Sequence, residues 1–211
     1  LASPHHASLP RGLAAEFAKG LTRQGAQVVA REFTHDKASD FNAILTKIRA
    51  TKPDLVFFGG MSAVAGPMLR QMKQLGFNAK MMGGDGICSD EIHKLSGGAM
   101  LDGQVFCAEA GGVDAAGRAG LDTFRADYKK RFGIDVQINA PYAYDAVMTM
   151  ADAMAQAGSS APAKYLPLLA KTRYKGVTGP IAFDARGDIR DGTITLYTFK
   201  GGKRSLLAVT K

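Results

Sequence analysis

Two glycine-rich turns that each follow an apolar run are the residues best placed to do chemistry in this sequence. The first is Gly59-Gly60-Met61, and the second is Gly83-Gly84-Asp85-Gly86. Ligands of open parallel sheets bind just beyond the carboxyl ends of the strands, where glycine lets the backbone approach a ligand closely. Asp85 would there be a negative group able to pair with an ammonium. The alternative is a turn that leads into a helix, with Asp85 exposed or capping.

Patterns typical of enzymes and metal sites are absent from the sequence. It has no GxSxG, no GxxxxGK[ST], no GxGxxG after a strand and no HExxH. Asp184, Arg186 and Asp188 faintly resemble a calcium loop, but the central glycine and the closing glutamate are missing, and the arginine would repel the ion. We therefore expect no catalytic residue, no metal and no cofactor. An enzyme on a Rossmann-like sheet stays open as an alternative.

The two cysteines, Cys88 and Cys107, do not have the spacing of a metal site. There is no CxxC pair, and the only histidine near them is His93, so zinc is not expected. A single disulfide between them is one option, and their spacing leaves the pairing open.

Composition and charge exclude several classes of protein. Apolar residues make up 46% and charged residues 22%, as in ordinary globular chains, which excludes disorder as the main state. The net charge is +8, but basic residues are interleaved with acids and there is no tryptophan for stacking, so we expect no nucleic-acid partner. No apolar run reaches the ~18 residues of a membrane-spanning helix.

Hydrophobic periodicity predicts alternating helices and short strands between residues 12 and 108. The nearly all-apolar run 54–58 is typical of a strand buried on both faces, as in a parallel sheet. The fold class is therefore α/β, a parallel sheet flanked by helices. The expected strands are 26–33, 54–58, 79–82 and 104–108, and the expected helix faces fall within 13–21, 41–48, 64–75 and 89–95.

The rest of the chain reads differently from this α/β lobe. Residues 1–11, which include His5 and His6, have no period and are expected to be irregular. Residues 109–180 are mainly helical, with helices expected at 121–132, 142–157 and 162–173. Residues 181–211 end in a β-hairpin that turns at Gly201-Gly202.

The order of several motifs resembles the type I solute-binding proteins of branched-chain amino acid ABC transporters, the leucine/isoleucine/valine-binding group. The resemblance extends from Gly12 to Val209. It is carried by Gly12-Leu13-Ala14, Asp40-Phe41, the 54–60 run into Gly59-Gly60, the stretch from Gln71 to Gly76, Gly83-Gly84-Asp85-Gly86, Tyr142-Ala143-Tyr144-Asp145-Ala146, and Gly179 with the 181–188 segment.

The resemblance implies two α/β lobes that clamp a ligand between them, of which this chain holds only part. Residues 12–108 would be most of the second lobe, residues 109–180 helices of an otherwise missing first lobe, and residues 181–211 a hairpin returning to the α/β lobe. Because the resemblance starts abruptly at Gly12, we expect a truncated or frame-shifted product. A naturally processed domain is the alternative.

The resemblance also implies which residues contact a ligand. An acid at the position of Asp85 receives the ligand's α-ammonium, and Met61 takes a position that is often aromatic and contacts the ligand's side chain. Gly60 and Gly84 complete the expected ligand-binding set. The Tyr-Gly pair that usually precedes the first helix is replaced by Leu9-Pro10-Arg11-Gly12, so that contact is lost.

The function implied is non-enzymatic: a periplasmic solute-binding component that captures a small aliphatic amino acid and presents it to an ABC permease. A ligand-sensing module of a receptor or regulator with the same fold is the alternative. We expect this chain alone to bind an amino acid weakly. We also expect the apolar helix faces between 119 and 173 to pack against the α/β lobe, against a second copy of the chain, or by exchange between copies.

Overall fold

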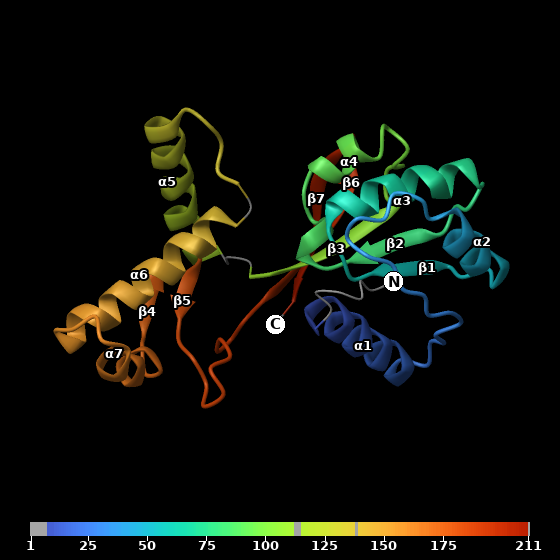
Figure 1. Cartoon of the computed structure of the whole chain (residues 1–211). Coiled ribbons are helices and arrows are strands. Elements are labelled where there is room, and N and C mark those ends of the chain that lie inside the picture. Colours follow the sequence, from blue (N-terminus) through green and yellow to red (C-terminus); the bar gives the residue numbers. More distant parts are fainter. Residues whose placement is uncertain (1–7, 112–114, 138, 211) are drawn as a thin grey trace. The chain divides into compact units, whose positions relative to one another are not determined.

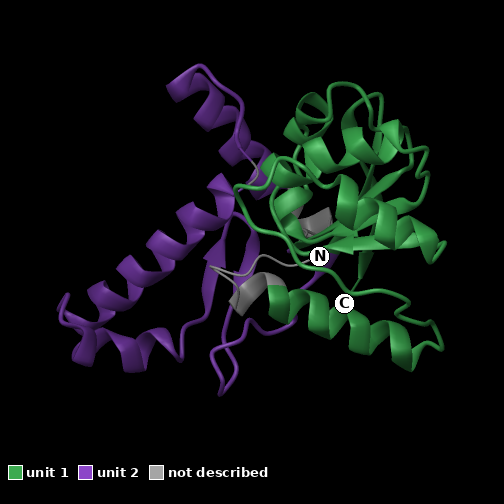
Figure 2. Ribbon diagram, turned by 45° about the vertical axis from the view of Figure 1, so that its right-hand side comes forward, with its two compact units in different colours: residues 1–110, 195–210 green, residues 111–194, 211 purple. Residues whose placement is uncertain are grey.

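The chain divides into two compact units. The computed structural model describes residues 8–111, 115–137 and 139–210, so His5 and His6 lie outside the described residues. Unit 1 comprises the described residues up to Ala110 together with Thr195–Thr210, and unit 2 comprises Gly111–Ile194 (Figure 2). No helix in the described ranges is long and apolar enough to cross a membrane.

Unit 1 is built on a mixed five-stranded sheet in the order β1-β2-β3-β6-β7 (Figure 1). Its first three strands run parallel, with Val56 opposite Met81 and Met82 opposite Phe106. The expected α/β class, with a parallel sheet flanked by helices, is confirmed, and so is the hairpin that turns at Gly201-Gly202. The strands are β1 Leu55–Phe58, β2 Lys80–Gly83, β3 Val105–Ala110, β6 Ile194–Lys200 and β7 Lys203–Thr210.

Apolar side chains from the helices and strands of unit 1 form a continuous core. Leu45, Met68 and Met81 are completely buried, and burying a side chain of this size stabilises a fold by about 1.5–3 kcal/mol. Asp40 supports the start of the second helix, because its Oδ1 accepts the N–H of Asn42 at 2.9 Å. The helical elements are α1 Ser8–Arg23, α2 Asn42–Ala50, α3 Ser62–Gln74, the 3-10 helix η1 Asp85–Ile87 and α4 Glu91–Leu95.

The first helix begins earlier than the sequence predicts. We expected residues 1–11 to be irregular, but α1 starts at Ser8 and includes Pro10. Proline is tolerated in the first turn of a helix, where its missing N–H has no helical partner to lose, so Pro10 does not delay the start.

The strand predicted at 26–33 is wrong. In this run only Phe33 makes a β-bridge, and the remainder is irregular. Val28 and Val29 are about half exposed. An alternating apolar pattern forms a strand only where a neighbouring strand completes its hydrogen bonds, and in the described ranges the run 26–33 is not a strand of the sheet, in which β1 stands at the edge beside β2.

Unit 2 contains three helices and a small hairpin. Its helix α6 Ala140–Ala157 matches the expectation, α5 Ala115–Phe132 begins before the predicted 121, and α7 Pro162–Leu169 ends before the predicted 173. The strands β4 Tyr174–Gly176 and β5 Gly179–Ile181 pair antiparallel. Helix α6 packs against α7 and β4.

A buried carboxylate organises the hairpin of unit 2. Asp145 is 2% exposed and accepts three hydrogen bonds, from Val177 N–H (2.9 Å), Thr178 N–H (2.8 Å) and Thr178 Oγ1 (2.5 Å). A Cβ at Gly176 would clash with this carboxylate, so glycine is required there. The motif Tyr142-Ala143-Tyr144-Asp145-Ala146 thus has a structural role in this unit.

The segment that faintly resembles a calcium loop is a tight turn closed by its own residues. The carboxylate of Asp184 accepts the N–H groups of Arg186 (2.8 Å) and Asp188 (2.9 Å), which lowers the pKa of Asp184. The Arg186 guanidinium lies 3.1 Å from Asp188 and 3.5 Å from Asp184. A cation of the protein itself therefore pairs with both carboxylates.

Candidate ligand-binding site

The carboxyl ends of three parallel strands meet at one edge of the unit 1 sheet. Strand β1 is followed by Gly60 and Met61, and β2 is followed by Gly84 and Asp85. Because β1, β2 and β3 are parallel neighbours, the turns after them lie side by side. The structure therefore brings all four predicted ligand residues to the same edge.

The two turns approach each other so closely that glycine is needed at Gly86. A Cβ on Gly86 would lie 2.6 Å from the Gly60 carbonyl oxygen and 2.8 Å from the Met61 sulfur. A Cβ on Gly84 would lie 2.8 Å from Leu13 Cδ2 of α1. Met61 itself is 65% exposed, so its thioether and methyl group are available to a ligand.

Asp85 occupies the first position of η1 and is exposed. In the part of the chain that the structure describes, its carboxylate has no hydrogen bond or ion pair, and it does not cap a helix. The structure fits the alternative interpretation, a turn that leads into a helix with Asp85 exposed, whereas side-chain capping by Asp85 is not seen. Contact between Asp85 and a ligand stays a prediction.

A second acid, Glu109 near the end of β3, was missed by sequence reasoning. Its side chain is 9% exposed and forms an ion pair with Arg204 at 3.0 Å. Burial raises the pKa of Glu109, the Arg204 guanidinium opposes that rise, and the negative charge of Asp85 adds to it. Asp85 and Glu109 therefore lie within electrostatic reach of each other. The alternation of Val105, Cys107 and Glu109 on the buried face of β3 was the available signal.

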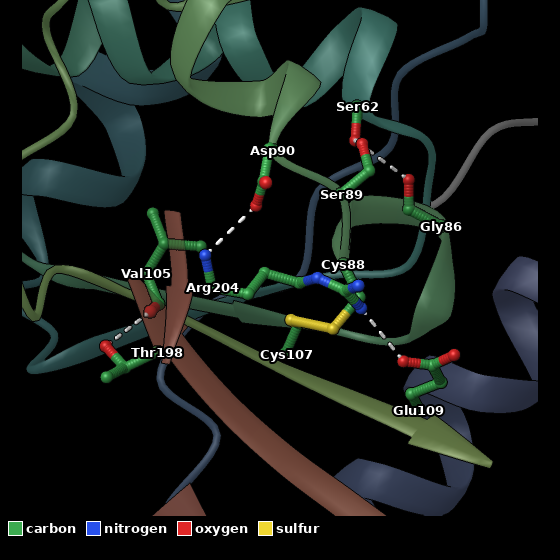
Figure 3. Close-up of a disulfide and its surroundings, with 10 residues drawn as sticks. All are labelled: Ser62, Gly86, Cys88, Ser89, Asp90, Val105, Cys107, Glu109, Thr198 and Arg204. Carbon is green, nitrogen blue, oxygen red and sulfur yellow. Dashed lines mark hydrogen bonds and ion pairs between the residues drawn. A yellow bond between two sulfur atoms is a disulfide. The ribbon is translucent and has the colours of Figure 1, made fainter. Parts of the chain in front are cut away.

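The cysteine pairing that the sequence left open is settled by the structure. Cys88 and Cys107 form a disulfide and are both completely buried. The bond joins the segment after β2 to β3 (Figure 3). Within the described ranges, no group of three or more His, Cys, Asp or Glu side chains is arranged to hold a metal ion.

A partly parallel sheet flanked by helices, with glycine-rich turns at the carboxyl ends of its strands, places the chain in the α/β class, in which ligands commonly bind at that edge. Residues 4–203 match the family model described as periplasmic binding protein, and the chain belongs to this family.

Curated relatives of the chain are named as amino acid-binding proteins. The leucine-, isoleucine-, valine-, threonine- and alanine-binding protein of Pseudomonas aeruginosa is 32% identical over 186 residues, which cover 88% of this chain and 49% of that protein. The leucine-specific-binding protein of Salmonella typhimurium is 29% identical over 197 residues, covering 93% and 52%. The chain thus spans about half the length of the curated relatives it matches.

Solved structures show the same fold. A leucine-binding protein from Thermotoga maritima MSB8 is 27% identical, with a TM-score of 0.85, and the match covers 98% of this chain and 58% of that one. A branched-chain amino acid transporter substrate-binding protein from Streptococcus pneumoniae, in complex with isoleucine, has a TM-score of 0.79 at 24% identity, covering 99% and 57%. At that identity the second likeness shows the fold alone.

Proposed function

We propose that this chain serves as the solute-binding component of an ABC transporter for branched-chain or related aliphatic amino acids. The observation that carries the proposal is the exposed carboxylate of Asp85, free of internal partners within the described residues, at the carboxyl edge of a parallel sheet. The names of the relatives support the choice of ligand.

In this proposal each of the four edge residues has a distinct role. Asp85 pairs with the α-ammonium of the amino acid in a charge-assisted hydrogen bond. Met61, a flexible and exposed side chain, contacts the aliphatic side chain of the ligand. Gly60 and Gly84 offer backbone N–H and C=O groups to the ligand, while the space that a Cβ would take at each is filled by Phe58 and by Leu13. In this proposal the chain binds its ligand without transforming it, as the names of its relatives as binding proteins suggest.

Binding by this chain alone is expected to be weak. Asp85 is exposed, and an exposed ion pair contributes only about 0.2–1 kcal/mol because water competes for both charges. A tighter complex requires the ligand to be shielded from water, and in the family resemblance a second lobe provides that. We propose a periplasmic location and an ABC permease as the partner on the same resemblance, with residues 109–180 serving that other lobe.

The proposal is tested by titrating the ¹⁵N-labelled chain with L-leucine and following the amide signals of Gly60, Met61 and Gly84. Asp85→Ala is expected to weaken binding by about threefold to fivefold, the loss of one exposed ion pair. Asp54→Ala is the matched control, because Asp54 is also exposed but precedes β1 at the opposite edge of the sheet. Equal affinities for the two variants would remove Asp85 from the site.

Self-association belongs to the same proposal. Val147 and Met148 on α6 and Leu166 on α7 are exposed apolar side chains of unit 2. We propose that they pack against a second copy of the chain. Light scattering at increasing concentration should show a rising mass, and a monomer at all concentrations would contradict this part.

A further inference from the structure

The segment that carries Asp85 is held by three other elements of unit 1, although its exposed acid has no partner of its own in the described ranges. We call residues 84–90 the Asp85 turn. Figure 3 shows the contacts that hold it, which come from α3, β3 and β7.

The strongest of these contacts is covalent. The disulfide joins Cys88 in the Asp85 turn to Cys107 in β3. The N–H of Cys88 donates to the Asp85 carbonyl oxygen at 2.9 Å. This hydrogen bond links the disulfide-bonded residue Cys88 directly to the backbone of Asp85. A disulfide restricts the alternative conformations of the segment that it closes.

Two further contacts hold the Asp85 turn on either side of Cys88. Ser62 Oγ, at the start of α3, donates to the Gly86 carbonyl oxygen at 3.1 Å and lies 3.4 Å from Ser89 Oγ. The backbone N–H of Arg204 in β7 donates to Asp90 Oδ1 at 3.0 Å. The turn is thus fixed from three directions.

The sheet does not need this disulfide to set its register. Strands β2 and β3 are already paired from Met81 opposite Val105 to Gly83 opposite Cys107. The disulfide leaves β3 at Cys107, the last residue paired with β2. It therefore restrains the Asp85 turn, which lies beyond the paired strands. Holding a binding group in place before the ligand arrives lowers the entropy lost on binding.

We propose that Cys88 and Cys107 are positioning residues whose disulfide holds the Asp85 carboxylate where it meets the ammonium of a ligand. The inference rests on the proposed function and deepens it. The chain with the disulfide distinguishes a ligand that has an ammonium from one that lacks it. The chain without the disulfide loses this distinction.

The test compares L-leucine with 4-methylpentanoate, which has the same carbon skeleton and carboxylate but no amino group. Both are titrated by NMR into the wild-type chain and into Cys88→Ala/Cys107→Ala. The wild-type chain should prefer L-leucine by about threefold, the contribution of an exposed ion pair. In the double variant the ratio should fall to about one. A purely structural role would weaken both ligands and leave the ratio unchanged, which would overturn the proposal.

Hydrogen exchange of the backbone amides in the same variant shows whether loss of the disulfide loosens only the Asp85 turn or the whole of unit 1. Without the disulfide, the amides of residues 87 and 88 should exchange at least about tenfold faster, while the Met81 amide, which donates to Gln104 in the sheet, stays protected. Equal acceleration at Met81, or loss of the fold, would show that the bond supports the whole unit and would overturn the proposal.

Ser62→Ala is a second variant that keeps the disulfide. It removes the α3 contact only, so the leucine preference should survive, and its loss there would contradict the primary role of the disulfide. The proposed function fails separately, if the wild-type chain itself shows no preference for L-leucine.

Discussion

Unit 1 and unit 2 differ in how much apolar side chain they bury, although both bury polar residues. Unit 1 has a core of large apolar residues such as Leu45, Met68 and Met81. Among the described residues of unit 2, the buried hydrophobic ones are only Ala153 and Ile181, whereas Asp145, Thr149 and Thr172 are buried polar residues. Unit 2 instead leaves exposed the apolar side chains Phe132, Ile134, Tyr144, Val147, Met148 and Leu166.

The difference teaches that the two units are stabilised by different forces. Removal of apolar surface from water holds unit 1 together and gives it a rigid edge on which a site can be built. In unit 2 the Asp145 carboxylate accepts three hydrogen bonds, whereas the buried hydroxyls of Thr149 and Thr172 have no partner in the described ranges.

The largest expected effect compares the same substitution in the two units. Met68→Ala removes a completely buried side chain from unit 1 and should lower its free energy of unfolding by about 2–5 kcal/mol. Met148→Ala in unit 2, where the side chain is 36% exposed, should cost less than about 1 kcal/mol. Urea unfolding followed by amide signals of each unit measures both. Equal losses would break the comparison.

The next effect concerns the polar centre of unit 2. Asp145→Ala leaves the donors of Val177 and Thr178 without an acceptor and should destabilise unit 2 by about 3 kcal/mol. Asp152→Ala, on the same helix, is the control, because its carboxylate accepts a single hydrogen bond within the described residues, from Gln156. Hydrogen exchange of the β4 and β5 amides should rise in the first variant alone. A matching rise in the control would mean that helix propensity, and not the buried carboxylate, is being measured.

The smallest effect depends on pH and belongs to unit 1. Burial raises the pKa of Glu109 in the folded chain, so the folded state holds the Glu109 proton more tightly than the unfolded state does. The stability gained from this protonation is fully present below the pKa of the unfolded chain and is lost as pH rises through the pKa of the folded chain. The Arg204 guanidinium offsets that loss. Arg204→Met should therefore lower the free energy of unfolding by about 1–3 kcal/mol at pH 7 and by less near pH 4, where Glu109 is protonated.

Arg70→Met is the matched control for this pH dependence. Arg70 is an exposed cation of α3 in the same unit, and its removal should cost the same small amount at both pH values. If Arg204→Met shows the same loss at pH 7 and at pH 4, the ion pair with Glu109 does not explain the stability that Arg204 supplies.

Most elements of the fold could be predicted from local pattern, whereas the run 26–33, the strand β4 and the start of α1 were not predicted correctly. The apolar run of β1 and the periodic faces of α3 and α6 predicted their elements correctly, since burial and helix period leave a direct mark on the sequence. The run 26–33 has a similar strand-like hydrophobic pattern but forms no strand. Strand formation needs a partner, and the pattern of a single segment cannot supply one.

The position of the predicted ligand residues could be derived from the sequence, but the contacts around them could not. Gly60, Met61, Gly84 and Asp85 all lie within three residues of the end of a strand, so their shared edge follows from the parallel arrangement alone. Glu109 and its partner Arg204 stand 95 residues apart, and Ser62 lies 24 residues from Gly86. No local pattern links such pairs.

By itself, the sequence determined the α/β class, the glycine-rich edge with Asp85 and the family resemblance, because these depend on period, residue type and order along the chain. Only the tertiary structure decided that Cys88 bonds to Cys107, that Glu109 is buried beside Arg204, and that Asp145 is the polar centre of unit 2. The physical reason is that pairing and burial are properties of neighbours in space, and the neighbours of these residues come from distant parts of the chain.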